Sequence, residues 1–158
     1  MDNLTLNIIN DDEHPIPGKD LLIKCFKLVA DKHNIDQAEV NVSIISNDEI
    51  QQINKQFRNK DKPTNIISFE FEKPEGLPDH IVDDFLGDIV IAPKVLEQEA
   101  KEQNKALENH WQHIFIHGLL HLLGYDHLND QEAEEMESLE IELLAKLGID
   151  NPYFIQEN

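Results

Sequence analysis

Short apolar segments rich in β-branched residues alternate along this chain with longer segments of helical periodicity. Four of the short segments partly alternate between apolar and polar positions, which is typical of strands. Between the first two, apolar residues recur at spacings of three and four, which predicts an amphipathic helix. The predicted strands are Leu4–Ile9, Val40–Ile45, Ile66–Phe71 and Leu86–Ile91, and the helix presents Leu22, Cys25, Phe26, Val29 and Ala30 on one face.

Local helix signals predict four further helices. Ser46–Glu49 has the form of a capping box, in which a serine and a glutamate bind the free backbone N–H groups at a helix start. Pro93 suits the first turn of a helix, where no backbone N–H is needed. A stretch rich in proline, glycine and acidic residues, Lys73–Asp84, predicts a loop. The first of the four helices begins after Ser46, and the second runs from Pro93 to about Asn104. The third covers Leu107–Leu123, and the fourth runs from about Asp130 to Leu147.

Four strands interleaved with helices indicate an α/β (α+β) fold, with a mixed sheet of about four strands packed against helices. Leu107–Leu123 is apolar on several sides, which predicts that this histidine-bearing segment is the central helix. The chain has 158 residues, the length of one domain, so we predict a single domain over residues 1–158. The pattern leaves the strand order open.

Composition narrows the class of protein. No apolar run approaches the roughly 20 residues of a membrane-spanning helix, so we expect no membrane association. The N-terminus has neither a basic region nor a small-residue cleavage site, so we expect no signal peptide. The single cysteine, Cys25, excludes an internal disulfide and fits a reducing compartment. We therefore predict a cytoplasmic protein.

The charge is strongly acidic overall but unevenly distributed. Thirteen basic and 32 acidic side chains give a formal net charge of −19, which argues against nucleic acid because a phosphate backbone attracts cations. Lys55–Lys62, here called the basic strip, nevertheless holds four bases, including the only arginine, Arg58, against one acid. We expect this strip to make weak, salt-sensitive and oriented contact with a polyanion. The seven acids of Asn129–Glu142 are interpreted as the solvated face of the last helix.

Histidines form the most informative pattern in the sequence. His117 and His121 are four residues apart, so a helix presents both imidazoles on one face. Gly124 follows at a position where a glycine ends a helix in the left-handed conformation. The chain then returns, and His127 is placed to supply a third ligand from the loop. The five clustered histidines are His110, His113, His117, His121 and His127.

Three neutral imidazoles that leave one coordination position open are typical of a catalytic zinc site, because structural sites use four protein ligands. We predict one zinc ion per chain at His117, His121 and His127. Nickel and copper also suit imidazole ligands. One alternative is a set of histidines without metal. Another places His113 among the ligands, although His113, His117 and His121 would spread over about 12 Å of helix. We therefore expect His113 behind the ligands or in the core.

The histidine spacing is that of the metzincin proteases, whose general base is a glutamate directly after the first histidine. In this chain that position is Gly118, which has no group to accept a proton from water. Asp126, next to His127, has two open interpretations: it orients a ligand or handles protons, or it caps the turn. A protease of the usual mechanism is therefore disfavoured.

The segment His117–His127 resembles the signature H-G-x-L-H-L-x-G-Y-D-H of the YbeY family, the bacterial metal-dependent endoribonucleases of ribosomal RNA maturation. Every specified position matches. Upstream, Phe57–Thr64 resembles the family segment F-R-x-x-x-x-x-T, and Ser68-Phe69 and Leu86–Ile89 resemble family strand motifs. One departure is Asn65, where the family usually has an aspartate after the threonine.

The resemblance implies a zinc-dependent, single-strand-specific endoribonuclease with His117, His121 and Arg58 as catalytic residues. Its implied role is 3′-end maturation of small-subunit ribosomal RNA and ribosome quality control. The implied partners are single-stranded ribosomal RNA and the small ribosomal subunit with its assembly factors, and no DNA is expected. The attacking group, water or the ribose 2′-OH, stays open. Two alternatives remain: a metal-stabilised ribosome assembly factor that does not cut RNA, and a metzincin-like metalloprotease.

Overall fold

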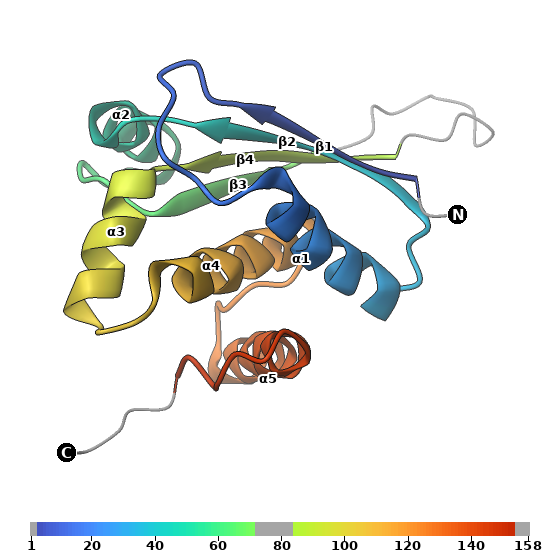
Figure 1. The fold of residues 1–158 in the computed structure, drawn as a ribbon. Helices are drawn as coiled ribbons and strands as arrows, with labels where there is room; N and C mark the ends of the chain where they lie inside the picture. The colour runs from blue at the N-terminus through green and yellow to red at the C-terminus, as the bar shows by residue number, and fades with distance from the viewer. Residues whose placement is uncertain (1–2, 72–83, 154–158) are drawn as a thin grey trace.

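The computed structural model describes residues 3–71 and 84–153 and confirms the predicted fold class. One mixed four-stranded sheet packs against helices (Figure 1). Apart from Asp84, the predicted loop Lys73–Asp84 lies outside the described residues. The strands are β1 (Asn3–Ile9), β2 (Gln37–Ile44), β3 (Ile66–Glu70) and β4 (Phe85–Ile91). The helices are α1 (Lys19–Lys32), α2 (Asn47–Arg58), α3 (Pro93–Glu102), α4 (Leu107–Leu122) and α5 (Asp130–Lys146).

The sheet has the strand order β1-β2-β4-β3. β1, β2 and β4 run parallel, and β3 is antiparallel to β4, with Ile66 opposite Ile91. Parallel neighbours need a crossover connection, and the chain supplies one in α1 between β1 and β2. β3 is the last strand in this order, so it lies at an edge of the sheet, where its residues are available to line a surface cleft.

Helices cover the two faces of the sheet unequally. In Figure 1, α1 and α4 lie side by side below the sheet, and α5 lies beyond α4. The main core joins this face of the sheet to those helices, with Phe26, Trp111 and Phe115 among its largest fully buried side chains. A smaller cluster under α2 contains Ile50 and Ile67 and covers part of the other face. The alternation of side chains along β3 explains the division, since Ile66 enters one cluster and Ile67 the other.

α4 is the central helix, as predicted, and it packs closely against β3. A Cβ atom added at Gly118 would lie 2.6 Å from Ile66 Cδ1 and 3.2 Å from Ser68 Oγ. The Ser68 hydroxyl donates to the Gly118 carbonyl oxygen at 2.9 Å, a direct link between the strand and the helix. The absence of a side chain at Gly118 thus permits the close approach that brings this part of α4 beside the edge strand.

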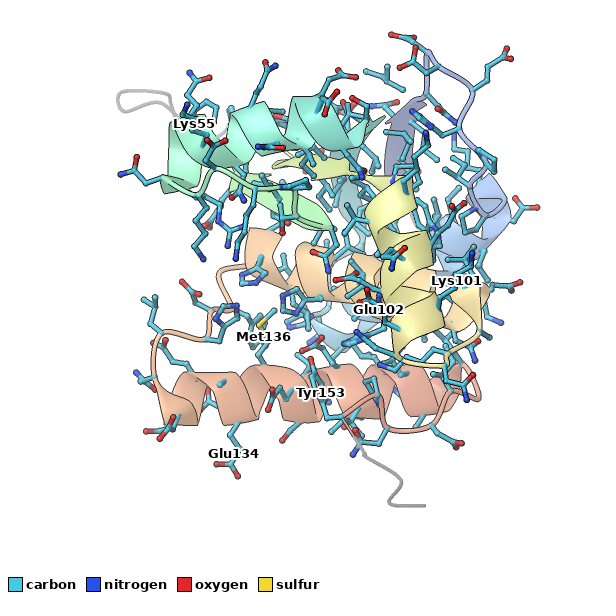
Figure 2. All side chains as sticks on the ribbon, turned by 90° about the vertical axis from the view of Figure 1, so that its left-hand side faces the viewer. Lys55, Lys101, Glu102, Glu134, Met136 and Tyr153 are labelled. Atoms are coloured by element: carbon cyan, nitrogen blue, oxygen red, sulfur yellow. The ribbon has the colours of Figure 1, made fainter. Side chains whose placement is uncertain are left out.

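The interpretation of the acidic residues on α5 is wrong for one member. Glu140 is fully buried, with 0% of its surface exposed, although the sequence pattern assigned it to the solvated face. In Figure 2, Met136 and Tyr153 lie on the side of α5 that faces α4, whereas Glu134 points away from it. The sequence does contain a signal: Glu140 falls four residues from Met136 and from Leu144, on the buried face of the helix.

No helix in the described part of the chain is long and apolar enough to cross a membrane.

Candidate metal centre and adjoining cleft

Three of the five clustered histidines meet at the C-terminal end of α4. His117 and His121 extend from the last two turns of the helix, and their Nε2 atoms are 3.1 Å apart. The rings of His117 and His127 stack with centroids 5.9 Å apart, and the centroid of His127 is 5.3 Å from that of His121. Ligand atoms of the three side chains all lie within 4.8 Å of one another.

Gly124 turns the chain so that His127 can reach the other two histidines. Its φ of +98° is a conformation that side-chain-bearing residues rarely adopt. The Gly124 N–H donates to the His121 carbonyl, and the Tyr125 N–H donates to the Leu120 carbonyl. These bonds satisfy carbonyls that a helix end leaves free and reverse the chain direction. His127 therefore lies on a loop that returns toward His117 and His121, as the sequence predicts.

The chemistry and spacing of this histidine cluster fit a zinc ion. Zinc binds imidazole nitrogen at about 2.0–2.1 Å in tetrahedral geometry, which separates neighbouring ligand nitrogens by roughly 3.3 Å. The 3.1 Å between the Nε2 atoms of His117 and His121 is close to that separation. Burial, and then the nearby His117 and His127, lower the pKa of His121, which favours the neutral ring that a metal requires.

Glu140 determines which nitrogen of His117 holds a proton. Its Oε1 atom lies 3.1 Å from His117 Nδ1 and 2.9 Å from His113 Nε2, and the Tyr153 hydroxyl donates to both carboxylate oxygens at 3.1 Å. Burial alone would raise the pKa of the Glu140 carboxyl, but the hydrogen bonds and charges of the two histidines outweigh it and hold the pKa at about 2. An ionised carboxylate only accepts, so His117 donates from Nδ1 and Nε2 of the neutral ring bears the lone pair.

His113 lies behind the histidine cluster. Its Nε2 atom is engaged by Glu140, and the residue is buried beside Tyr153, whose ring centroid is 5.3 Å away. His110 is bound separately, with its Nε2 atom 3.0 Å from Glu99 Oε1. Among the described residues, the potential metal-binding group contains neither of these two histidines.

Asp126 makes the contact expected of a turn-capping residue. Its Oδ1 atom accepts from the backbone N–H of His127 at 2.8 Å. This bond holds the loop on which His127 is presented. It supports the turn interpretation of Asp126, and the side chain also lines the adjoining cleft.

A cleft of about 570 Å³ joins the histidine cluster to the end of α2 and to the edge strand β3. Arg58, the last residue of α2, lines this cleft together with all three histidines. Asn59 adopts the left-handed conformation with φ of 57° and ends α2 at this point. The structure thus places the only arginine, although separated from His117 by 59 positions, in the same cleft as the histidines.

Asn65 also lines the cleft and has a structural partner outside it. Its side-chain N–H group donates to both carboxylate oxygens of Glu99, at 3.1 and 3.3 Å. Burial favours the neutral acid, but the hydrogen bonds from His110 and Asn65, together with the charges of His110 and Lys105, lower the pKa of Glu99. The amide of Asn65 therefore suits a position beside the ionised carboxylate of Glu99, whereas an aspartate at position 65 would repel that carboxylate.

Comparison with known proteins identifies the family. The family model named Endoribonuclease YbeY matches residues 7–148. Proteins named Endoribonuclease YbeY from Francisella tularensis subsp. novicida and Francisella philomiragia are each 80% identical over all 158 residues, which cover 98% and 100% of those proteins. This chain belongs to the YbeY family of endoribonucleases. It is accordingly a hydrolase that acts on RNA, and the resemblance noted in the sequence is confirmed.

The fold agrees with a solved structure. The solution structure of TM1509 from Thermotoga maritima is similar with a TM-score of 0.57 and 28% sequence identity, over 90% of this chain and 91% of that one. The packing of α4 against β3 also accounts for Gly118. A glutamate there, as in the metzincins, would place its Cβ atom 2.6 Å from Ile66 Cδ1, so the present packing of α4 against β3 would have to shift to admit the protease base.

Proposed function

We propose that this endoribonuclease cuts single-stranded RNA with one zinc ion held by His117, His121 and His127. The observation that supports this most directly is the single cleft lined by the three histidines and Arg58. We further propose that residues 1–158 act as one endoribonuclease domain, because one hydrophobic core joins the sheet to α1, α4 and α5.

Zinc, when bound, supplies a Lewis acid for phosphate oxygens and makes water more acidic. His117 and His121 would contribute Nε2 atoms, since these face each other at 3.1 Å. Glu140 acts behind them as a positioning residue: by accepting from Nδ1, it fixes the His117 tautomer and increases the basicity of the ring. The negative charge of Glu140 also favours a cation nearby.

Arg58 is proposed to bind the phosphate of the bond that is cut. A guanidinium group matches two phosphate oxygens at once and remains charged at every relevant pH. Its place at the end of α2, in the same cleft as the histidines, allows it to stabilise negative charge that develops on the phosphate. The neighbouring lysines of the basic strip then contact phosphates further along the strand.

A ribosomal context is proposed for the substrate. With a net charge of −19, the protein repels free polyanions over much of its surface, whereas the basic strip attracts them locally. RNA held by the small ribosomal subunit and its assembly factors would be presented to that strip at high local concentration. We propose small-subunit ribosomal RNA, near its 3′ end, as the substrate, and the cytoplasm as the location.

The test is cleavage of a short single-stranded RNA by zinc-loaded wild type, His117→Ala and Arg58→Ala, purified in parallel. We expect cleavage by wild type, none by His117→Ala, and a reduced rate with full zinc content and an unchanged melting temperature for Arg58→Ala. Equal cleavage by wild type and His117→Ala would contradict the zinc mechanism and indicate a contaminating nuclease. Loss of zinc from Arg58→Ala would show that its assigned role is wrong.

The same preparation identifies the attacking group. A substrate with one 2′-deoxyribose at the scissile position remains cleavable if water attacks, and resists cleavage if the neighbouring 2′-OH attacks. Duplex RNA of the same sequence should be cut much more slowly, because its phosphates are held in a rigid A-form helix.

A further inference from the structure

The two most exposed large apolar side chains of the described residues adjoin the proposed site. Leu128, 82% exposed, follows His127, and Phe57, 62% exposed, precedes Arg58. Exposed apolar groups next to polar ones are a feature of ligand-binding grooves. Of the two, Phe57 also lines the cleft itself.

Packing of the fold does not require the exposed part of Phe57. α2 is already anchored by Ile50, which is fully buried, and by Ile53 in the smaller core cluster. Phe57 makes a T-shaped ring contact with Phe69 of β3, at a centroid distance of 5.2 Å and an interplanar angle of 75°. This contact restrains the ring while most of its surface stays accessible in the cleft.

We propose that Phe57 is a stacking platform for a nucleobase of the RNA strand whose phosphate is bound by Arg58. The proposal rests on the proposed function and adds a base-binding subsite to it. A nucleotide presents an anionic phosphate and an aromatic base a short distance apart, and the chain offers a guanidinium and an aromatic ring at consecutive positions of one cleft.

Stacking on Phe57 would favour single-stranded RNA without strong sequence preference. Every base has an aromatic face, so a stacking contact tolerates all four bases and contributes about 1–3 kcal/mol. A base in a duplex has both faces covered by its neighbours and cannot stack on a side chain without leaving the helix. Stacking on Phe57 is therefore a physical reason why the protein itself would prefer single-stranded RNA to a duplex.

The experiment measures binding of a short single-stranded RNA to metal-stripped protein in the presence of a chelator, so that binding is separated from cleavage. Phe57→Ala is compared with Phe57→Tyr, which keeps an aromatic face, and with the matched control Phe71→Ala. Phe71 is 38% exposed and has the same kind of contact, with a centroid 5.2 Å from Phe85, but it does not line the cleft. An abasic ribose-phosphate oligomer of equal length is the second ligand.

We expect Phe57→Ala to weaken RNA binding by about 5- to 150-fold, the equivalent of the stacking energy, with no change in binding of the abasic oligomer. Phe57→Tyr and Phe71→Ala should stay within about threefold of wild type, a change below 1 kcal/mol. Unchanged RNA binding by Phe57→Ala, or an equal loss for the abasic oligomer, would overturn the stacking assignment. An equal loss in Phe71→Ala would do the same.

The outcome separates this proposal from the zinc mechanism. Base-dependent binding through Phe57 with no zinc-dependent cleavage would leave the subsite in place and refute the mechanism alone. Zinc-dependent cleavage that Phe57→Ala leaves unchanged in both KM and kcat, together with unchanged RNA binding, would refute the subsite alone. If Phe57 instead contacts an apolar group of a protein partner, Phe57→Ala would likewise leave RNA binding and cleavage unchanged.

Discussion

Replacing Glu140 by glutamine tests whether a buried carboxylate sets the zinc affinity of the histidine cluster. The substitution keeps the shape of the side chain but removes its charge and one acceptor. Three donors converge on Oε1 of Glu140, from His113, His117 and Tyr153, at 2.9, 3.1 and 3.1 Å. A glutamine supplies one acceptor oxygen and an N–H group that finds no acceptor among protonated ring nitrogens, so His117 loses its charge-assisted hydrogen bond.

The expected magnitude follows from the contact that is lost. Loss of a partner that orients a zinc-binding histidine weakens metal binding about 10- to 100-fold, which corresponds to about 1.4–2.8 kcal/mol. Glu99→Gln is a matched control. Glu99 Oε1 accepts at 3.0 Å from His110, a histidine of α4 like His113 and His117, but Glu99 touches none of the three proposed ligands. We expect its zinc affinity to stay within about twofold of wild type.

The assay is competition for zinc against a chromophoric chelator, with circular dichroism of the metal-free proteins to show that both variants fold. Nitrogen NMR of the metal-free proteins should show His117 protonated at Nδ1 in wild type and a mixture of tautomers in Glu140→Gln. If folded Glu140→Gln binds zinc as tightly as wild type, or if Glu99→Gln loses as much affinity, the assigned role of Glu140 is refuted.

Three further predictions concern stability and reactivity. Gly118→Ala gains about 1 kcal/mol of helix propensity but loses about 1–3 kcal/mol through overpacking against Ile66 Cδ1, so urea denaturation should show a net loss of about 0–2 kcal/mol, and a clear gain would contradict the packing argument. Burial raises the pKa of the Cys25 thiol to about 12, so a thiol reagent at pH 8 should label it only as the protein unfolds; labelling at the rate of a free thiol would disprove this. Asn65→Asp places a second carboxylate beside Glu99, so the free energy of unfolding should fall by about 1–3 kcal/mol at pH 8. The loss should shrink as the pH falls below about 5 and one carboxyl gains a proton; a pH-independent loss would exclude charge repulsion.

Much of the candidate site is predictable because its geometry is local. The 3.6-residue helix repeat alone brings His117 and His121 onto one face, and Gly124 predicts the turn that returns His127. The capping box before α2 is likewise a local feature, and the structure contains both of its hydrogen bonds. Such features depend on bonds among residues a few positions apart, so the order of residues specifies them.

Glu140 shows why the remaining part of the candidate site could not be predicted from local sequence patterns. It is one of seven acids in a short segment, and their side chains are chemically alike. Packing of α5 against α4 buries this one beside His113 and His117, and the donors there are what make an ionised buried carboxylate tolerable. The apolar-face position of Glu140 was a signal, but a charged residue there also fits a helix that does not pack at that point.

The sequence by itself determined the fold class, the positions of the elements, and a three-histidine cluster at a helix end. It also indicated the family, because the histidine signature combines residue types and spacing that chance seldom produces. The tertiary structure alone decided the strand order, the burial of Glu140, and the cleft that Arg58 and Phe57 share with the histidines. The physical reason is range: helix geometry and turns act over a few residues, whereas the cleft exists because packing of distant segments around one core places the end of α2 and the edge strand β3 beside the end of α4.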